Sequence, residues 1–370
     1  MTDYSQEKHQ EFSKKLTDIL NYGALNLAMG IGYRLDLFDV MDEFEIPATP
    51  SAIAEKTGLN ERYITEWLGA MVCGGIVELG KNEQGEAVFS LPKEHADLIT
   101  KRSGVSNLGV YTQEIPLLTS SVMENVVEGF KDGNGVGYEK YSEFQSFMTQ
   151  LADAKHSRML VQTFLPSVKK GLLVEKLKSG IRVCDLGCAE GVALMLMAEA
   201  FPKSRFVGID IGEEVIRRAE KTAKERGISN ASFLQIDAAS LADYPEWKNT
   251  FDYVTAFDAI HDQTRPLEAL KGSYAVLKPG GEFSMVDIAA SSDLGENVVH
   301  PMGAFLYTVS LMHCMPVGLV NGGAGLGMMW GRQKALKMLE AAGFSNVEVL
   351  NIPYDSFNLH FFAQKPDKAG

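Results

Sequence analysis

Apolar side chains recur at helical spacing near the beginning of the chain. Leucine, isoleucine, phenylalanine and methionine residues appear every three or four positions through residues 12–45, which predicts one or two amphipathic helices. Thr49 and Asn60 then precede two short helical stretches as N-caps, and two short apolar runs follow at 76–79 and 88–91. Helix, turn, helix and hairpin in this order predict a winged-helix domain.

From about residue 181 the pattern changes to short apolar runs that alternate with helical ones. The predicted strands lie at 182–185, 204–210, 231–236, 251–257, 281–287, 346–351 and 359–364. The predicted helices between and after them lie at 192–201, 213–226, 267–277 and 333–342. This alternation predicts an α/β fold with a Rossmann-like, doubly wound parallel sheet and a ligand site at the carboxyl ends of its strands.

These patterns divide the chain into three predicted parts. Residues 1–105 form a helical winged-helix domain, 106–178 a helical connection and substrate lid, and 179–370 the α/β domain. The stretch 300–331 contains no Lys, Arg, Asp or Glu and is long enough to span a bilayer. Because it contains prolines and many glycines and lacks basic flanks, we expect a buried helix and loop over a pocket instead.

The charge of the chain argues against nucleic acid as a partner. The whole sequence has 35 basic and 48 acidic residues, a net charge of −13. Residues 1–102 have ten basic and seventeen acidic residues, and the recognition helix at 60–67 is itself net negative. A DNA groove would repel such a helix, and an anionic membrane would not attract the chain. We therefore expect no nucleic-acid or membrane partner and a winged-helix domain that builds a homodimer or closes a pocket.

The cysteines and the first residues indicate a cytoplasmic protein. The N-terminal twelve residues are polar and lack the basic-then-apolar pattern of a signal peptide. The cysteines are too few and too scattered for a disulfide framework, which suits a reducing compartment: Cys73, Cys184, Cys188 and Cys314.

A glycine loop follows the first strand of the α/β domain, and acidic residues follow the next strands. Asp185, Gly187 and Gly191 lie between that strand and the helix, where small residues allow close backbone approach to a ligand. Asp210 ends the second strand, where a carboxylate accepts hydrogen bonds from both hydroxyls of a ribose. Asp237 ends the third, where it can accept from an adenine amino group. Together they predict a nucleoside site.

With Leu277–Gly281 before a strand, this order of residues resembles the class I S-adenosylmethionine-dependent methyltransferases. The family usually has glycine at the position of Ala189. The winged helix extends the resemblance to the winged-helix small-molecule methyltransferases, O-methyltransferases and their bacterial relatives. The loop does not fit a dinucleotide-dependent dehydrogenase, because Asp185 stands where that fingerprint has its first glycine.

The resemblance implies S-adenosylmethionine as cofactor and S-adenosylhomocysteine as product. The residues that it assigns to the cofactor are Asp185, Gly187, Ala189, Glu190, Gly191, Asp210, Ile211, Asp237, Ala238 and Phe257.

His261 and Asp262 follow the fourth predicted strand at the edge of the same crevice. O-methyltransferases of this architecture have a His-Asp pair at the matching place, which implies that His261 is the general base and that Asp262 orients its partners. The alternative is a histidine that caps the strand or packs on the adenine. The carboxylate that should pair with the base is not located by the sequence.

The uncharged stretch predicts an acceptor pocket that is largely apolar. Its expected lining residues, with two tyrosines from the helical connection, are Tyr138, Tyr141, His313, Cys314 and Met315, and Tyr111 and the 322–327 loop are expected to cover it. Simple core packing is the alternative for this cluster. We expect no metal, because His261, His300, His313 and Cys314 lack ligand spacing along the chain.

The sequence thus predicts methyl transfer to a small-molecule acceptor, with oxygen preferred and nitrogen or sulfur possible. Two alternatives stay open. One is a winged-helix transcriptional regulator that senses S-adenosylmethionine, and the other is a cofactor-binding scaffold without catalysis.

Overall fold

The computed structural model describes residues 4–367, apart from the side chains at positions 105, 142, 145 and 158. Its internal contacts divide the chain into two compact units, Met1–Leu117 and Leu118–Gly370. The two units are described separately, and the three-part division expected from the sequence stays a prediction.

The first unit is helical with a two-stranded wing. Its elements are α1 (Gln6–Arg34), α2 (Leu37–Asp42), α3 (Pro50–Thr57), α4 (Glu61–Cys73), β1 (Glu78–Lys81), β2 (Ala87–Ser90), α5 (Lys93–Ile99), and the 3₁₀ turns η1 (Lys101–Ser106) and η2 (Gly109–Gln113). The side chains of Thr49 and Asn60 accept hydrogen bonds from the first turns of α3 and α4, as predicted. Trp67 on α4 donates its indole N–H to the Ala28 carbonyl at 2.9 Å, which fixes α4 against α1.

The second unit contains a seven-stranded sheet in the order β5-β4-β3-β6-β7-β9-β8. Its strands are β3 (Arg182–Leu186), β4 (Arg205–Asp210), β5 (Ala231–Gln235), β6 (Phe251–Phe257), β7 (Leu277–Ile288), β8 (Glu348–Ile352) and β9 (Asp355–Gln364). The strands β3 to β7 pair in parallel. The expectation of a wholly parallel sheet is wrong at one edge, because β9 runs antiparallel to β7 and β8. The turn between β8 and β9 is too short for a crossover helix, so these strands form a hairpin.

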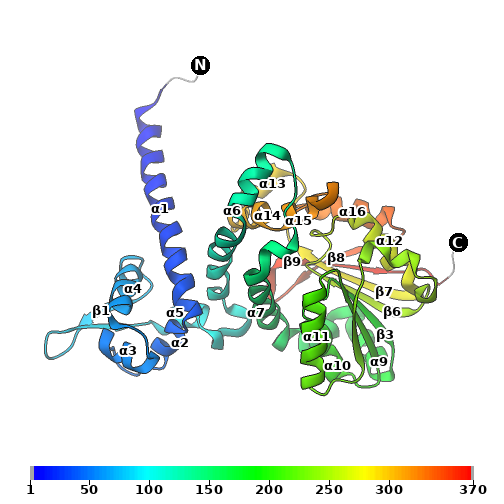
Figure 1. The fold of residues 1–370 in the computed structure, drawn as a ribbon, viewed down its shortest axis with the longest axis horizontal. Coiled ribbons are helices and arrows are strands. Elements are labelled where there is room, and N and C mark those ends of the chain that lie inside the picture. The colour runs from blue at the N-terminus through cyan, green and yellow to red at the C-terminus, as the bar shows by residue number, and fades with distance from the viewer. Residues whose placement is uncertain (1–3, 368–370) are drawn as a thin grey trace. The chain divides into compact units, whose positions relative to one another are not determined.

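Helices cover both faces of this sheet (Figure 1). One face packs against α9 (Leu172–Ser179), α10 (Val192–Ala200) and α11 (Glu213–Glu225). The other packs against α12 (Pro266–Val276) and α16 (Arg332–Ala341). This doubly wound arrangement leaves the carboxyl ends of β3, β4, β6 and β7 at one edge, where the predicted site residues follow the strands.

The remaining helices of the second unit come from two parts of the chain. The helical connection contains α6 (Glu114–Asp132), η3 (Tyr138–Tyr141), α7 (Ser142–Met159), η4 (Leu160–Phe164), α8 (Leu165–Ser167) and η5 (Val168–Gly171). After β5 come η6 (Ala238–Asp243) and η7 (Pro245–Trp247), and after β7 come α13 (Leu294–Asn297), α14 (Gly303–Met312), α15 (Cys314–Leu319) and η8 (Val320–Gly322).

The uncharged stretch is therefore a helix pair that breaks at His313. No single helix in the described residues is long and apolar enough to span a membrane, although α14 and the segment 314–322 pass that test as a pair bent by 41°. Leu306 and Met329 from this stretch are buried against Ile288 and Ala290 at the end of β7. This packing places the helix pair beside the strand ends.

Candidate active site

The glycine loop joins β3 to α10 in a conformation that requires its glycines. Gly187 and Gly191 have φ angles of 63° and 76°, in the left-handed region that glycine adopts freely. A side chain at Gly187 would collide with Ala259, and one at Gly191 with the ring of Phe233. The loop is thus held tightly against its neighbours, and Ala189 is the one residue of 187–191 that is exposed.

Ala189 explains why the resembling family favours glycine at its position. Its φ is 47°, also in the left-handed region, which costs a residue with a Cβ about 1–2 kcal/mol. The carboxylate of Asp210 stabilises this conformation, because it accepts the Ala189 N–H at 3.0 Å and the Gly212 N–H at 2.8 Å. Burial raises the pKa of Asp210, and these N–H donors oppose that rise. Alanine is therefore accommodated here, with Asp210 tying the loop to the end of β4.

Asp185 lies inside the strand end and does not face open solvent. Its carboxylate accepts a hydrogen bond of 2.7 Å from the Thr255 hydroxyl on the neighbouring strand β6. Burial raises the pKa of Asp185 to about 7, and the Thr255 bond acts in the opposite direction. The residue thus links β3 and β6 at the base of the loop.

The other predicted cofactor residues differ in their hydrogen-bond partners and in their exposure to solvent. Asp237 caps η6 through the Ala239 N–H at 2.9 Å and pairs with Arg265 at 2.8 Å, so both of its oxygens have partners. Ala238, next to it, is buried. Ile211 exposes 56% of its surface beyond β4 and is accessible to a ligand.

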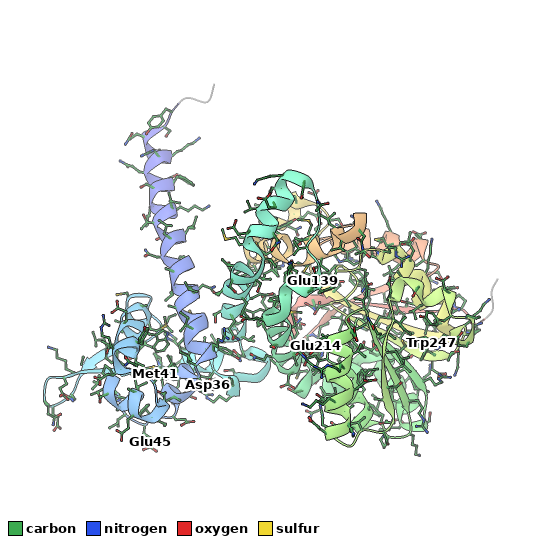
Figure 2. The ribbon with its side chains drawn as sticks, in the orientation of Figure 1. Asp36, Met41, Glu45, Glu139, Glu214 and Trp247 are labelled. Carbon is green, nitrogen blue, oxygen red and sulfur yellow. The ribbon has the colours of Figure 1, made fainter. Side chains whose placement is uncertain are left out.

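Glu190 and Phe257 pack in ways that the sequence did not indicate. Glu190 pairs with Arg218 at 3.0 Å, and Arg218 also pairs with Glu214 on α11, which is labelled in Figure 2. Phe257 packs against the rings of His156 and Phe164 in tilted and edge-on contacts, with ring centres 5.0 and 5.8 Å away. Their roles at the cofactor stay predictions.

A tight turn after β6 directs His261 into the sheet edge. Asp258 has a φ of 49°, and its carboxylate is held by Lys155 at 3.0 Å and by the Asn358 amide at 2.7 Å. His261 follows three residues later and is only 2% exposed. The turn therefore buries the imidazole next to the end of β7.

His261 pairs there with Asp287, a residue that the sequence did not single out. The Nδ1–H of His261 donates to Asp287 Oδ1 at 2.8 Å, and the Trp330 indole N–H and the Ile288 N–H donate to the same oxygen at 3.0 and 2.8 Å. Asp287 is 1% exposed. These bonds fix the imidazole and leave Nε2 directed away from Asp287, 3.4 Å from Asp262 Oδ1.

The charges around His261 raise its pKa. Burial alone lowers the pKa of His261, but the carboxylates of Asp287 and Asp262 outweigh burial and hold that pKa well above its ordinary value. The nearby His313 has no such carboxylate pair, and burial lowers its pKa. A buried histidine held by a buried carboxylate is typical of a catalytic base.

The expected pocket residues gather around Asp262. Tyr138 donates its hydroxyl to Asp262 Oδ2 at 3.3 Å while 37% of its surface is exposed, and burial of the hydroxyl together with the Asp262 charge raises its pKa. His313 Nδ1 lies 3.9 Å from the same oxygen and 3.6 Å from Cys314 Sγ. The structure thus brings Tyr138, His313 and Cys314 together at the predicted base.

Aromatic side chains form the wall behind this cluster. Tyr141 donates its hydroxyl to the Met312 carbonyl at 2.9 Å, at the break between α14 and α15. The rings of Tyr141 and Phe144 each lie 4.8 Å from the His313 ring. Met315 follows Cys314 on α15, where its Cβ lies against Gly327 of the second glycine-rich loop, residues 322–327. The wall is apolar except for the Tyr141 hydroxyl and the His313 ring nitrogens, and its role as an acceptor pocket stays a prediction.

The glycine loop at 322–327 packs onto the turn that contains His261. The Ala324 N–H donates to the Thr264 carbonyl at 2.9 Å, and a side chain at Gly323 would collide with Thr264. Ser310 on α14 accepts the Met328 N–H at 3.1 Å. The loop therefore closes against the same cluster.

Two families match separate parts of the chain. Residues 177–343 match the family described as a methyltransferase domain. Residues 23–101 match the family described as an Rv2258c-like winged HTH domain. Each match coincides with one of the folds described above.

Relatives and solved structures agree with these matches. A demethylmenaquinone methyltransferase of Listeria welshimeri is 24% identical over 210 residues, which are 54% of this chain and 85% of that protein. An erythromycin 3''-O-methyltransferase of Saccharopolyspora erythraea is 28% identical over 183 residues, 48% of this chain and 54% of that protein. Human N-acetylserotonin methyltransferase, solved with S-adenosylmethionine, shares the fold with a TM-score of 0.65 at 16% identity, covering 99% of each chain.

The comparisons confirm the predicted fold, the winged helix and the methyltransferase domain. The individual site residues stay predictions, now with a geometry that can be tested.

Proposed function

We propose that this protein is an S-adenosylmethionine-dependent methyltransferase that transfers the methyl group of the cofactor to a hydroxyl oxygen of a small, largely apolar molecule. The observation that carries the proposal is the buried His261–Asp287 pair, whose Nε2 lies 3.4 Å from Asp262 Oδ1 in the cluster of expected pocket residues. Nitrogen or sulfur acceptors have less need of a base, so the pair favours oxygen.

The cofactor supplies a methyl group that its sulfonium already activates. The chain's own part is to bind and align both reactants and to exclude water. Asp210 would accept hydrogen bonds from the ribose hydroxyls, and Asp237 would accept from the adenine amino group. The backbone of the 187–191 loop would face the methionine portion. Both carboxylates already have protein partners, so binding requires them to exchange or share those hydrogen bonds.

In the proposed reaction, His261 Nε2 would take the proton of the acceptor hydroxyl, and the bound cofactor would supply the methyl group and leave as S-adenosylhomocysteine. Asp287 stabilises the positive charge that forms on the imidazole and keeps Nδ1 protonated, so that Nε2 is the basic nitrogen. Asp262 lies beside that nitrogen and accepts a hydrogen bond from Tyr138, and these two side chains would hold the acceptor hydroxyl in line.

The proposed acceptor class follows from the pocket wall. Tyr141 and Phe144 are buried against the His313 ring, and together with Met315 they are aromatic and thioether side chains of the kind that suit a flat or apolar molecule. The stretch 300–331, which contributes much of this wall, contains no lysine or arginine, so we do not propose an anionic substrate.

The direct test is transfer of an isotope-labelled methyl group from S-adenosylmethionine into a size-fractionated cell extract, followed by mass spectrometry. We expect label in the small-molecule fraction, on an oxygen atom. Label in nitrogen or sulfur would overturn the acceptor atom, and label only in protein or nucleic acid would overturn the substrate class.

Asp210→Ala should weaken binding of S-adenosylhomocysteine at least tenfold, about 1.4 kcal/mol, because it removes charge-assisted bonds to the ribose. Isothermal titration calorimetry measures the change. The matched control is Asp243→Ala, which removes an exposed carboxylate on η6 and should leave affinity unchanged. An unchanged affinity in Asp210→Ala, in a variant with native thermal unfolding, would contradict the cofactor assignment.

A regulator that senses S-adenosylmethionine is the second candidate, because the family match of the N-terminal region is to a winged helix-turn-helix domain. Its recognition helix α4 has two glutamates and one arginine and is repelled by DNA phosphates. Specific binding to duplex DNA with a steep salt dependence would support this candidate. The other alternative, a cofactor-binding scaffold without catalysis, would be excluded by turnover with any small acceptor.

We also propose that the first unit builds a homodimer in the cytoplasm. The four cysteines are free, which suits a reducing compartment. One face of α1 presents apolar side chains that are each 45–68% exposed: Phe12, Leu16, Ile19, Leu20, Leu27 and Ile31. They recur at helical spacing, and such a continuous apolar face on a soluble helix is typical of an interface.

Leu20→Glu should shift the protein from dimer to monomer in sedimentation experiments, because it places a charge in the centre of this face. Asn21→Glu is the matched control. It introduces the same charge on the opposite side of α1 and should leave the dimer intact. A monomeric wild type would contradict the proposal.

A further inference from the structure

We propose that His261, Asp262 and Cys314 form a binding site for a thiophilic divalent cation such as Zn²⁺. One ligand atom from each residue lies within 4.8 Å of the other two. The three are an imidazole nitrogen, a carboxylate oxygen and a thiol sulfur, the donor types that zinc binds in proteins. They come from the turn after β6 and from the first residue of α15, so the fold joins residues that have no ligand spacing along the chain.

The separations between the donors suit a small cation. His261 Nε2 lies 3.4 Å from Asp262 Oδ1. Ligands on a tetrahedral zinc ion with bonds of about 2.0–2.3 Å lie roughly 3.3–3.8 Å apart. His313 is the next donor, with Nδ1 3.6 Å from Cys314 Sγ and 3.9 Å from Asp262 Oδ2. A cation among the three ligands would therefore have a second imidazole beside it.

The surroundings of His261 are those of a metal-binding histidine. Its Nδ1 donates to Asp287 at 2.8 Å, so that in the neutral imidazole the free electron pair is on Nε2. This carboxylate–histidine arrangement orients most zinc-binding imidazoles. Trp330 in turn anchors Asp287 at 3.0 Å, so the imidazole is oriented before any cation arrives.

Asp262 supplies a second and independent observation. Its Oδ1 is buried and has no hydrogen-bond partner among the described residues, although it lies next to Nε2. A buried carboxylate oxygen without a donor is unfavourable and gains most from a cation. Cys314, which completes the trio, is a buried free thiol.

Occupation of this site would block the proposed base. Coordination uses the Nε2 electron pair that would otherwise accept the acceptor's proton, so Zn²⁺ should inhibit methyl transfer. This consequence rests on the proposed function, whereas the site itself rests on the geometry of the three donors.

The test is titration of the reduced, full-length protein with Co²⁺, which replaces zinc and has a visible spectrum. We expect one equivalent to bind, with a thiolate-to-cobalt charge-transfer band that Zn²⁺ abolishes. Cys314→Ser should remove this band and weaken Co²⁺ binding at least tenfold. Asp262→Asn should weaken binding at least tenfold and keep the band, because the sulfur remains. Circular dichroism checks that both variants are folded.

Two cysteine variants serve as controls. Cys73→Ser removes an exposed thiol of the first unit, and Cys188→Ser removes a buried thiol of the 187–191 loop. Both variants should keep the band. A band that survives in Cys314→Ser, or that disappears in either control, would overturn the site, as would the absence of any band. A band at Cys314 without inhibition by Zn²⁺ would support the site and overturn the role of His261 as base.

Discussion

His261→Ala should lower kcat by about 10²-fold or more, the usual contribution of a positioned general base, while the affinity for S-adenosylhomocysteine stays within about twofold. The substitution removes the nitrogen that would accept the acceptor's proton, whereas the cofactor residues proposed above are unchanged. Steady-state kinetics with the acceptor found by isotope transfer, combined with calorimetry on the cofactor product, measures both quantities.

The control for this variant is His300→Ala. His300 is a partly buried histidine of the same unit that accepts the Met302 N–H and has no contact with the His261 pair. Its substitution should leave kcat unchanged. If His261→Ala loses cofactor affinity together with turnover, the histidine has a structural or adenine-packing role instead.

Asp287→Asn should also lower kcat, by roughly 10²-fold, because an amide does not hold Nδ1 protonated and does not stabilise the imidazolium. Asn has nearly the same shape, so packing around Trp330 and Ile288 is preserved. Asp287 acts through His261 and is therefore a positioning residue, which means that loss of activity alone does not establish its role.

The pH profile supplies the independent readout. The base must be neutral to accept a proton, so kcat/KM should rise with pH through the pKa of His261, which Asp287 and Asp262 hold well above its ordinary value. Burial lowers the pKa of His261, and the Asp287 charge is the largest effect that opposes it. Without that charge the pKa of His261 should fall, and the acid limb of the profile in Asp287→Asn should move to lower pH. An acid limb at the same pH in both proteins would contradict the pairing.

Local rules predicted most of the fold. Thr49 and Asn60 cap their helices because their side chains can accept the free N–H groups of the first turn wherever the helix packs. The parallel strands β3 to β7 follow from short apolar runs separated by helices. The antiparallel direction of β9 could not be predicted from such runs, because its first residues, Asp355–Asn358, are mostly polar and do not resemble a strand. Pairing with β7 and β8 supplies what the local pattern lacks.

The site was predictable only where its residues follow one another along the chain. The glycine loop and the strand-end carboxylates have fixed spacing, so the sequence located them. Asp287 lies 26 residues after His261, and only the adjacency of β6 and β7 brings the two together. The one available signal was its position at the end of a predicted strand. The approach of Cys314 to His261 depends on the helix break at His313, which no local pattern indicated.

The hydrogen bond from Trp330 to Asp287 gives the protein an intrinsic optical reporter. An indole whose N–H donates to a carboxylate changes its emission when the charge on that carboxylate or on a neighbouring imidazole changes. The other two tryptophans, Trp67 and Trp247, lie in the winged helix and in η7. In a protein with phenylalanine at both of those positions, the fluorescence of Trp330 would follow protonation of the His261–Asp287 pair in real time, without label or substrate.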